Sequence, residues 1–238
     1  MSYRETLKQA AEAAGFPLTE GQLDQFQQYG DLLLETNKSL NLTAITDPEE
    51  VAVKHMVDSL LVYNREAFHN HTIVDVGTGA GFPGLPLKIY DPGMRVTLID
   101  SLQKRLNFLG QVVETLGLGQ VRLVHGRAED AGKDPALREK FDVAGVARAV
   151  AALPVLAEYC LPLVRVGGVF YAMKGSKYQE EADAARHAVE VLGGKIREIR
   201  PVQLPGLTDK RAIITIEKVR STPKQYPRKA GTAVKKPL

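Results

Sequence analysis

The chain has 238 residues, 44% of them hydrophobic and 25% charged, a balance typical of a globular protein with apolar residues enough for a large core. The sequence contains no apolar run near the roughly 18 residues of a membrane span and no apolar stretch behind the N-terminus, which argues against a membrane protein and a secretory signal. Cys160 is the only cysteine, which excludes a disulfide framework and a cysteine-based zinc cluster. We therefore expect a cytoplasmic protein that binds neither metal nor membrane.

The net charge of +3 is unevenly distributed along the chain. Residues 195–238 contain twelve Lys and Arg against three acidic residues, a balance of +9, which leaves −6 for residues 1–194. A basic end on an acidic body indicates a polyanionic partner. A solubilising tail would explain the same charges.

The N-terminal part of the chain, residues 1–70, is predicted to form a small helical subdomain. Ser2 with Glu5 matches a capping box, and the same pattern recurs at Thr19 with Gln22. A third helix is expected to begin at the Asp-Pro-Glu-Glu sequence of residues 47–50, where a cap and a proline precede acidic residues.

From residue 72 the pattern changes to short apolar runs separated by helical stretches. The predicted strands are 72–76, 95–99, 121–124, 141–147 and 169–173, and the predicted helices are 103–116, 153–164 and 178–192. This alternation indicates an α/β fold with a mostly parallel sheet and helices on both faces.

The end of the chain is predicted to close the sheet and then leave it. Two runs, 196–202 and 212–218, are joined by Pro205-Gly206 without a helix, which predicts an antiparallel hairpin and a total of seven strands. The sheet domain then spans 71–218. The basic tail, 219–238, has no periodicity and no acidic residue, and we expect it to be extended.

A glycine-rich loop, DVGTGAGFPG at residues 75–84, follows the first predicted strand. An open α/β sheet has its ligand crevice at this place. Glycines here allow the backbone to approach a flat ligand closely, although a tight strand-to-helix turn needs them too. The Gly79-x-Gly81-x-x-Gly84 spacing also satisfies the dinucleotide-binding fingerprint.

Two residues of the loop favour a methyl donor over a dinucleotide. A carboxylate at Asp75 would repel a pyrophosphate and attract a sulfonium, and Pro83 lacks the N–H that would bind a phosphate. Asp100, at the end of the second predicted strand, suits a ribose diol in either ligand or caps the next helix. A class I methyltransferase is therefore favoured, with an NAD-dependent oxidoreductase and a non-catalytic RNA-binding protein as alternatives.

Further candidates follow the next predicted strands. Ser101 comes after Asp100, and the segment 126–129 lies where a class I methyltransferase holds adenine. Arg148 ends the fourth predicted strand and is expected to face the same crevice, unless it is an ordinary surface arginine.

The order of these motifs resembles one family, the bacterial 16S ribosomal RNA guanine-N7 methyltransferases, formerly called glucose-inhibited division protein B. The resemblance covers nearly the whole chain. It rests on residues 75–87 (DVGTGAGFPGLPL), 96–109 with Asp100-Ser101 and Lys104-Arg105, 127–129, 147–150, 41–44, His55 with 58–60, Lys174-Gly175 and 226–231.

The resemblance implies a class I, Rossmann-like fold with a helical N-terminal extension. It further implies S-adenosylmethionine as methyl donor and methylation of N7 in a guanosine of the 527 type in the 530 loop of 16S ribosomal RNA. Donor contacts are implied at Gly77, Phe82, Ala128, Glu129 and Arg148. Together with the residues considered above, the predicted donor-binding set adds Asp75, Gly79, Gly81, Asp100 and Ser101.

RNA contacts are predicted at Asn41, Lys174, Arg211, Tyr226, Arg228 and Lys229, with 16S ribosomal RNA or the small ribosomal subunit as the partner of a monomer. Tyr226 offers a stacking surface beside two cations of the tail. Deletion of the tail is expected to weaken RNA binding and to leave donor affinity almost unchanged.

No general base is expected, because guanine N7 carries a lone pair and no proton. Arg148 would then orient the reactants and transfer no proton. His55 and Asp58 lie three residues apart on a predicted helix, which favours a local hydrogen bond over a catalytic role. Cys160 falls among leucines and is expected to lie in the core.

Overall fold

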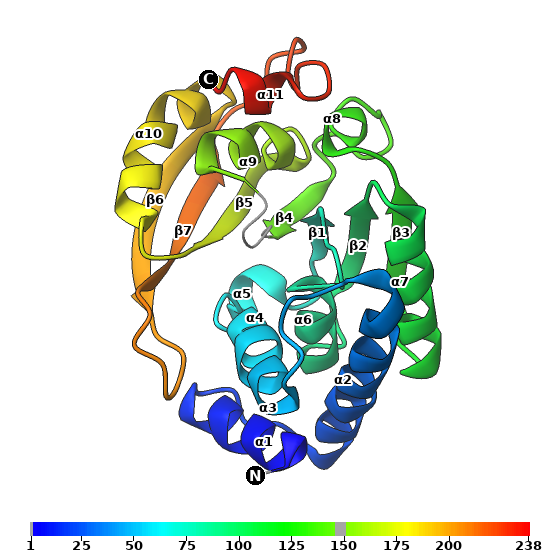
Figure 1. Ribbon diagram of the computed structural model, residues 1–238. Helices are drawn as coiled ribbons and strands as arrows, with labels where there is room; N and C mark the ends of the chain where they lie inside the picture. Colours follow the sequence, from blue (N-terminus) through cyan, green and yellow to red (C-terminus); the bar gives the residue numbers. More distant parts are fainter. Residues whose placement is uncertain (1, 146–150) are drawn as a thin grey trace.

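Seven strands form one sheet in the computed structural model, which describes residues 2–145 and 151–238 (Figure 1). The strand order is β3-β2-β1-β4-β5-β7-β6. Neighbouring strands from β3 to β5 are parallel, and β7 is antiparallel to both β5 and β6. The strands are β1 Thr72–Val76, β2 Arg95–Asp100, β3 Val121–His125, β4 Phe141–Gly145, β5 Val164–Lys174, β6 Gly194–Val202 and β7 Arg211–Lys218. The predicted mostly parallel sheet with a C-terminal antiparallel hairpin is confirmed.

One strand and one helix differ from their predicted bounds by four or five residues, and the other bounds that the structure describes differ by at most two. The helix predicted over 153–164 ends at Cys160, because Pro162 has no N–H to continue the helical hydrogen bonds. β5 begins at Val164 instead of residue 169, and its pairing with β4 shifts register between Phe141 and Val143. The bulged, glycine-containing start of β5 breaks the apolar run by which a buried strand is identified. The last two positions of the predicted strand 141–147 lie outside the described residues.

Helices cover both faces of the sheet. They are α1 Tyr3–Ala13, α2 Glu20–Leu40, α3 Pro48–Val51, the π-helical η1 Ala52–Val57, α4 Asp58–Leu60, α5 Arg65–Phe68, α6 Gly84–Tyr90, α7 Gln103–Thr115, α8 Ala128–Ala131, α9 Leu153–Cys160, α10 Tyr178–Val191 and α11 Thr232–Lys235. In Figure 1, α8 to α11 lie above the sheet and the N-terminal helices lie below it. Among the described helices, none is both long and apolar enough to cross a membrane.

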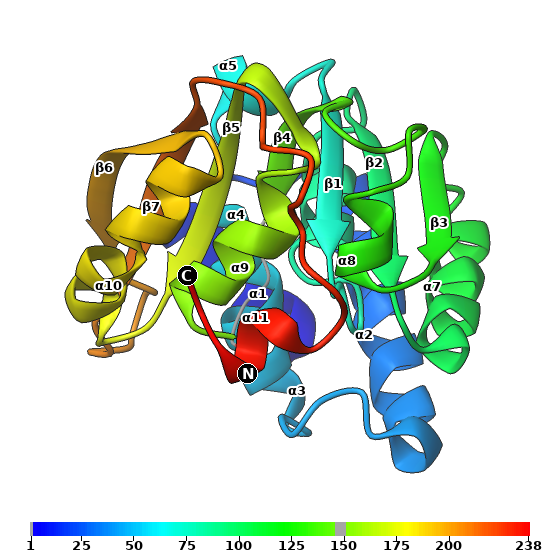
Figure 2. The ribbon, with the colours of Figure 1, turned by 90° about the horizontal axis from the view of Figure 1, so that it is seen from above.

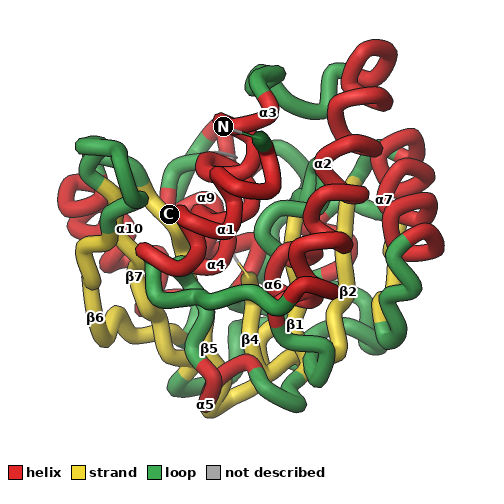
Figure 3. Tube along the Cα trace, turned by 90° about the horizontal axis from the view of Figure 1, so that it is seen from below, coloured by secondary structure: helices red, strands yellow, loops and turns green. Residues whose placement is uncertain are grey.

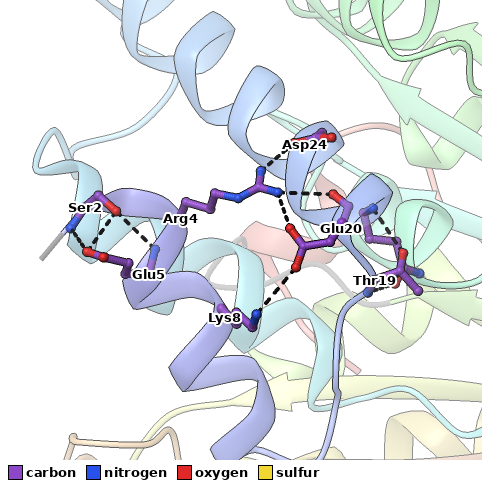
Figure 4. A network of polar contacts seen from close by, with 8 residues as sticks. Ser2, Arg4, Glu5, Lys8, Thr19, Glu20 and Asp24 are labelled. Atoms are coloured by element: carbon purple, nitrogen blue, oxygen red, sulfur yellow. Dashed lines mark hydrogen bonds and ion pairs between the residues drawn. The ribbon is translucent and has the colours of Figure 1, made fainter.

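The two predicted capping boxes are confirmed (Figure 4). Glu5 Oε2 accepts the backbone N–H of Ser2 at 2.9 Å, and Gln22 Oε1 accepts that of Thr19 at 2.9 Å. Arg4 pairs with Glu20 and so joins α1 to α2. Since these charges are exposed, they contribute little stability and mainly orient the two helices.

The N-terminal helices share one hydrophobic core with the sheet. Leu7 of α1, Phe26 and Tyr29 of α2, and Leu98 of β2 belong to a single buried cluster. Figure 3 shows α1, α2 and α4 lying across this face of the sheet. Apolar packing is therefore continuous across the predicted boundary near residue 70, and the helices form a layer on the sheet.

The tail, which was expected to be extended, has only the short helix α11 as regular structure and packs on the body of the protein. Arg138 donates to the backbone oxygens of Thr222 at 2.7 Å and Tyr226 at 2.8 Å. Arg228 pairs with Glu158 of α9 at 2.6 Å, and Glu158 is only 1% exposed. Figure 2 shows the tail running past α9 to α11 on the same face of the sheet. Partners far away in sequence hold the tail, so it shows no local periodicity.

Lys218, the last residue of β7, is fully buried. Its ammonium donates to the oxygen of Val164 at 3.1 Å and pairs with Glu139 at 3.2 Å. Burial lowers its pKa to about 8, against 10.5 for an ordinary lysine. Glu139 also accepts the N–H of Thr222 at 2.8 Å, so this pair anchors the start of the tail.

We predict that the free energy of unfolding rises between pH 8 and pH 10 in the wild type relative to Lys218→Met. Over this interval the unfolded chain keeps the lysine proton and the folded protein loses it, so raising the pH favours the folded state. The difference should be about 2 to 3 kcal/mol, measured by urea unfolding of both proteins at each pH. Identical pH slopes in the two proteins would contradict the lowered pKa.

Candidate functional site

The glycine loop connects β1 to α6 through three glycines with left-handed backbone. Gly77, Gly79 and Gly81 have φ of 68°, 61° and 100°, values that residues with a Cβ adopt only under strain. A Cβ at Gly79 would meet only the oxygen of Gly77, at 4.0 Å. The loop therefore presents open backbone at Gly79.

Asp75 binds both ends of this loop and is 1% exposed. Its Oδ2 accepts the hydroxyl of Thr78 at 2.8 Å and the N–H of Gly84 at 3.0 Å. A buried carboxylate needs such donors, since burial without them is costly. Asp75 thus has a structural role that the sequence did not indicate, and its direct contact with a sulfonium stays a prediction.

Asp100, at the end of β2, connects the loop to the next strand. Its Oδ2 accepts the N–H of Gly79 at 2.9 Å, and its Oδ1 accepts the N–H of Leu102 at 2.9 Å. The second bond supports the turn before α7, but the N-cap of that helix is Leu102 and has no side-chain cap, so Asp100 does not cap it. Asp100 also lines a pocket, where its carboxylate can reach a diol.

This pocket has a volume of about 340 Å³ and lies at the carboxyl ends of β1, β2 and β3. It brings together five of the predicted donor-binding residues, Gly77, Asp100, Ser101, Ala128 and Glu129. The other lining residues are Val76, Ile99, Gly126, Arg127, Leu156, Tyr159, Gly231 and Val234. The apolar side chains suit a flat ring, while Asp100 and Glu129 supply hydrogen-bond acceptors, so the pocket fits an adenosyl group.

Four lining residues from distant segments were missed in the sequence, namely Leu156 and Tyr159 of α9 and Gly231 and Val234 of the tail. Glu129 accepts the N–H of Gly231 at 3.0 Å. Burial, together with the charge of Glu129 and a hydrogen bond to it, raises the pKa of Tyr159. No local sequence signal identifies these residues. They belong either to the C-terminal tail, far from the glycine loop in sequence, or to α9, whose apolar sequence predicts a core helix.

Gly81 and Phe82 face the helical layer on the other side of the loop. A Cβ at Gly81 would lie 2.6 Å from the hydroxyl of Tyr29 and 2.9 Å from Leu109. The ring of Phe82 stacks on Tyr29 and on His55, with centroid distances of 5.6 and 4.6 Å. Gly81 is thus required for packing, and donor contacts of both residues stay predictions.

His55, which stacks on Phe82 of the loop, also lines a second, larger cleft of about 620 Å³. Its ring Nε2 lies 2.6 Å from the hydroxyl of Thr43. The cleft lies between η1, the end of β5 and the start of β7, and it is lined by Ile45, Lys54, His55, Asp58, Met173, Lys174, Gly175, Ser176, Val202, Asp209, Lys210, Arg211, Ala212 and Ile213. Four of these residues are lysine or arginine and two are aspartate, so the lining is basic. The predicted bond between His55 and Asp58 stays a prediction.

Three of the predicted RNA-binding cations are paired inside the protein. Lys174 binds Glu181 at 2.7 Å, Arg211 binds Asp58 at 2.8 Å, and Arg228 binds Glu158. An RNA phosphate would therefore have to compete with a carboxylate at each of them.

The other predicted RNA contacts differ in exposure. Asn41 is exposed and caps α2 with a left-handed φ of 49°, Lys229 is exposed, and Tyr226 is half-buried. RNA binding by all six residues stays a prediction.

Arg148 and Cys160 are the two remaining candidates from the sequence. Arg148 lies outside the described residues. Cys160 is fully buried in the core, as expected, and burial raises the pKa of its thiol. Within residues 2–145 and 151–238, no group of three His, Cys, Asp or Glu side chains could hold a metal ion.

Two alanine substitutions should separate ligand binding from packing in the loop. Gly79→Ala adds a methyl group in open space, so we expect a folded protein that loses about 1 kcal/mol of stability to backbone strain and binds adenosylmethionine at least ~10-fold more weakly. Gly81→Ala should instead destabilise the fold by roughly 2 kcal/mol or more, through overpacking and strain. Urea unfolding and calorimetric titration measure the two effects. Wild-type donor affinity in folded Gly79→Ala would contradict the predicted donor contact at Gly79.

Comparison with known proteins identifies the family. Residues 22–213 match the family model GidB, rRNA small subunit methyltransferase G. The chain is 52% identical over 227 residues to Ribosomal RNA small subunit methyltransferase G of Lactobacillus johnsonii, covering 94% of this chain and 95% of that protein. It is 48% identical over 239 residues to the protein of the same name from Alkaliphilus metalliredigens, covering 100% of both.

A solved structure shares the fold at low sequence identity. M. jannaschii TYW2 in complex with AdoMet superposes with a TM-score of 0.51 at 17% identity, over 64% of this chain and 71% of that chain. The class I methyltransferase fold is thereby confirmed. The near full-length relatives set aside the NAD-dependent oxidoreductase considered from the sequence. The matched family model and the near full-length relatives show that the chain belongs to the rRNA small subunit methyltransferase G family.

Proposed function

We propose that this protein transfers a methyl group from S-adenosylmethionine to N7 of one guanosine in the decoding region of 16S ribosomal RNA. Family membership supports ribosomal RNA as the substrate class, and the resemblance of the motifs supports N7. We also propose that the protein acts in the cytoplasm as a monomer, on the small ribosomal subunit or its RNA.

The observation that carries the proposal is the position of the glycine loop between two cavities. Gly77 lines the pocket that fits an adenosyl group, and Phe82 stacks on His55, which lines the basic cleft. A donor held on one side of the loop and an RNA base entering from the other side would meet at this loop. The donor, when bound, supplies an electrophilic methyl group on a sulfonium.

The residues of the chain contribute alignment and a defined electrostatic environment. Asp100 would accept hydrogen bonds from the ribose, and the apolar side chains of the pocket would hold the adenine ring. Fixed alignment of nucleophile and methyl carbon can supply several kcal/mol of the rate enhancement. Because guanine N7 has a lone pair and no proton, none of these residues has to remove a proton.

The rate of methyl transfer should therefore be nearly independent of pH between about 6.5 and 8.5, the interval in which a catalytic histidine would titrate. Single-turnover rates with donor and RNA both saturating measure this. His55→Ala should change the rate by the same factor at each pH. A tenfold rise per pH unit that disappears in His55→Ala would make His55 a catalyst and overturn the mechanism.

Lys210 is an exposed cation at the cleft and gives a direct test of RNA binding. Lys210→Gln should lower RNA affinity and reduce the slope of log K against log salt by about 0.7, the value for one lost phosphate contact on single-stranded RNA. Lys195→Gln, an exposed lysine at the other end of β6, is the matched control and should leave the slope unchanged. Equal slopes for both variants and the wild type would exclude Lys210 as a phosphate contact.

A further inference from the structure

The pocket proposed for the donor has one wall that belongs to the C-terminal tail. Gly231 and Val234 both line this pocket, together with residues that follow β1, β2 and β3. Gly231 precedes α11 with φ of 76° and donates its N–H to Glu129. The tail thus contacts an acceptor that the resemblance assigns to the donor.

The side chain of Val234 is unusually exposed to solvent for a large apolar residue of this protein. It is 62% exposed, against 42% for Val219 and 41% for Leu102, and it projects from the one-turn helix α11 at the pocket. An apolar side chain exposed at the edge of a pocket gains free energy when a flat apolar ligand covers it. The adenine ring of an adenosyl group is such a ligand.

The position of this wall is determined by buried polar contacts. Arg228 donates to both carboxylate oxygens of Glu158, at 3.0 and 2.6 Å, and Glu158 also accepts the N–H of Arg228 at 2.7 Å. The next residue of α9, Tyr159, lines the same pocket. One helix therefore provides both an anchor for the tail and part of the pocket wall. A Cβ at Gly132 would lie 2.8 Å from Pro227, so the tail also packs closely on the turn after α8.

We propose that the tail is a structural part of the donor site, in which Gly231 orients Glu129 and Val234 covers the adenosyl group. This inference rests on the proposed donor site. It reverses the expectation from the sequence that removal of the tail leaves donor affinity unchanged. The basic residues of the tail had predicted an RNA-binding segment. The tail residues that line the pocket, Gly231 and Val234, are both uncharged.

The test replaces Val234 by a neutral polar residue of similar size. Val234→Asn should weaken binding of adenosylmethionine about tenfold in calorimetric titration, because a polar amide cannot replace the apolar contact. Since Val234 is exposed, the melting temperature without ligand should stay unchanged. Val219→Asn is the matched control, an exposed valine of the same tail outside the pocket, and should bind as the wild type does.

Binding of a donor fragment tests which part of adenosylmethionine Val234 contacts. Methylthioadenosine lacks the amino-acid group, so Val234→Asn should weaken its binding by the same factor if Val234 covers the adenosyl part. Truncation after Ala230 removes both tail residues of the pocket and should weaken both ligands further. The melting curve of the truncated protein shows whether it remains folded. If the truncated protein is unfolded, the ligand affinities of Val234→Asn alone test the proposal.

The outcomes separate this inference from the donor site itself. Wild-type affinity in Val234→Asn, together with weak binding in Gly79→Ala, would overturn the role of the tail and leave the donor site in place. Wild-type affinity in both variants would overturn the role of the tail and the donor contact predicted at Gly79. Weaker binding of adenosylmethionine with unchanged binding of methylthioadenosine would also contradict the contact proposed here.

Discussion

The whole site depends on two buried carboxylates that bind the glycine loop. Asp75 and Asp100 end neighbouring parallel strands, β1 and β2, and accept hydrogen bonds from Gly84 and Gly79. Each is at most 2% exposed, so each needs these donors to offset its burial. The loop is thereby held with one side toward the pocket and with Phe82 on the other side. Without these bonds the loop would lose its position beside the pocket that Gly77 lines.

The N-terminal helices contribute to the site through their contacts with the glycine loop. The hydroxyl of Tyr29 in α2 donates to the backbone oxygen of Ala80, and its ring stacks on Phe82. His55 in η1 also stacks on Phe82 and lines the cleft. π-Helical turns are common at functional sites. The helical layer thus supports the loop and supplies one wall of the cleft, in addition to covering the sheet.

The basic residues of this chain have two roles, ion pairing within the protein and exposure for phosphate binding. Composition alone does not distinguish them. Arg228 is 70 residues from its partner Glu158, and Arg211 is 153 residues from Asp58. These cations stabilise contacts between distant segments, where an unpaired buried carboxylate would be costly. Lys210 and Lys229 remain exposed and are better placed for phosphate. The surplus of positive charge at the C-terminus is therefore partly structural.

Local patterns in the sequence were sufficient for most of the fold and for five of the residues that line the proposed donor pocket. Period-two and apolar runs identified the strands, caps at Ser2 and Thr19 identified helix starts, and the strand-end position of Gly77 and Asp100 placed both in one pocket. These predictions succeed because they depend on neighbours within a few residues. The path of the tail, the pairing of Lys174 and Arg211, and the places of Tyr159 and Val234 were decided by tertiary structure. Each depends on which distant segments meet, and a contact of that kind leaves no periodic trace in the sequence.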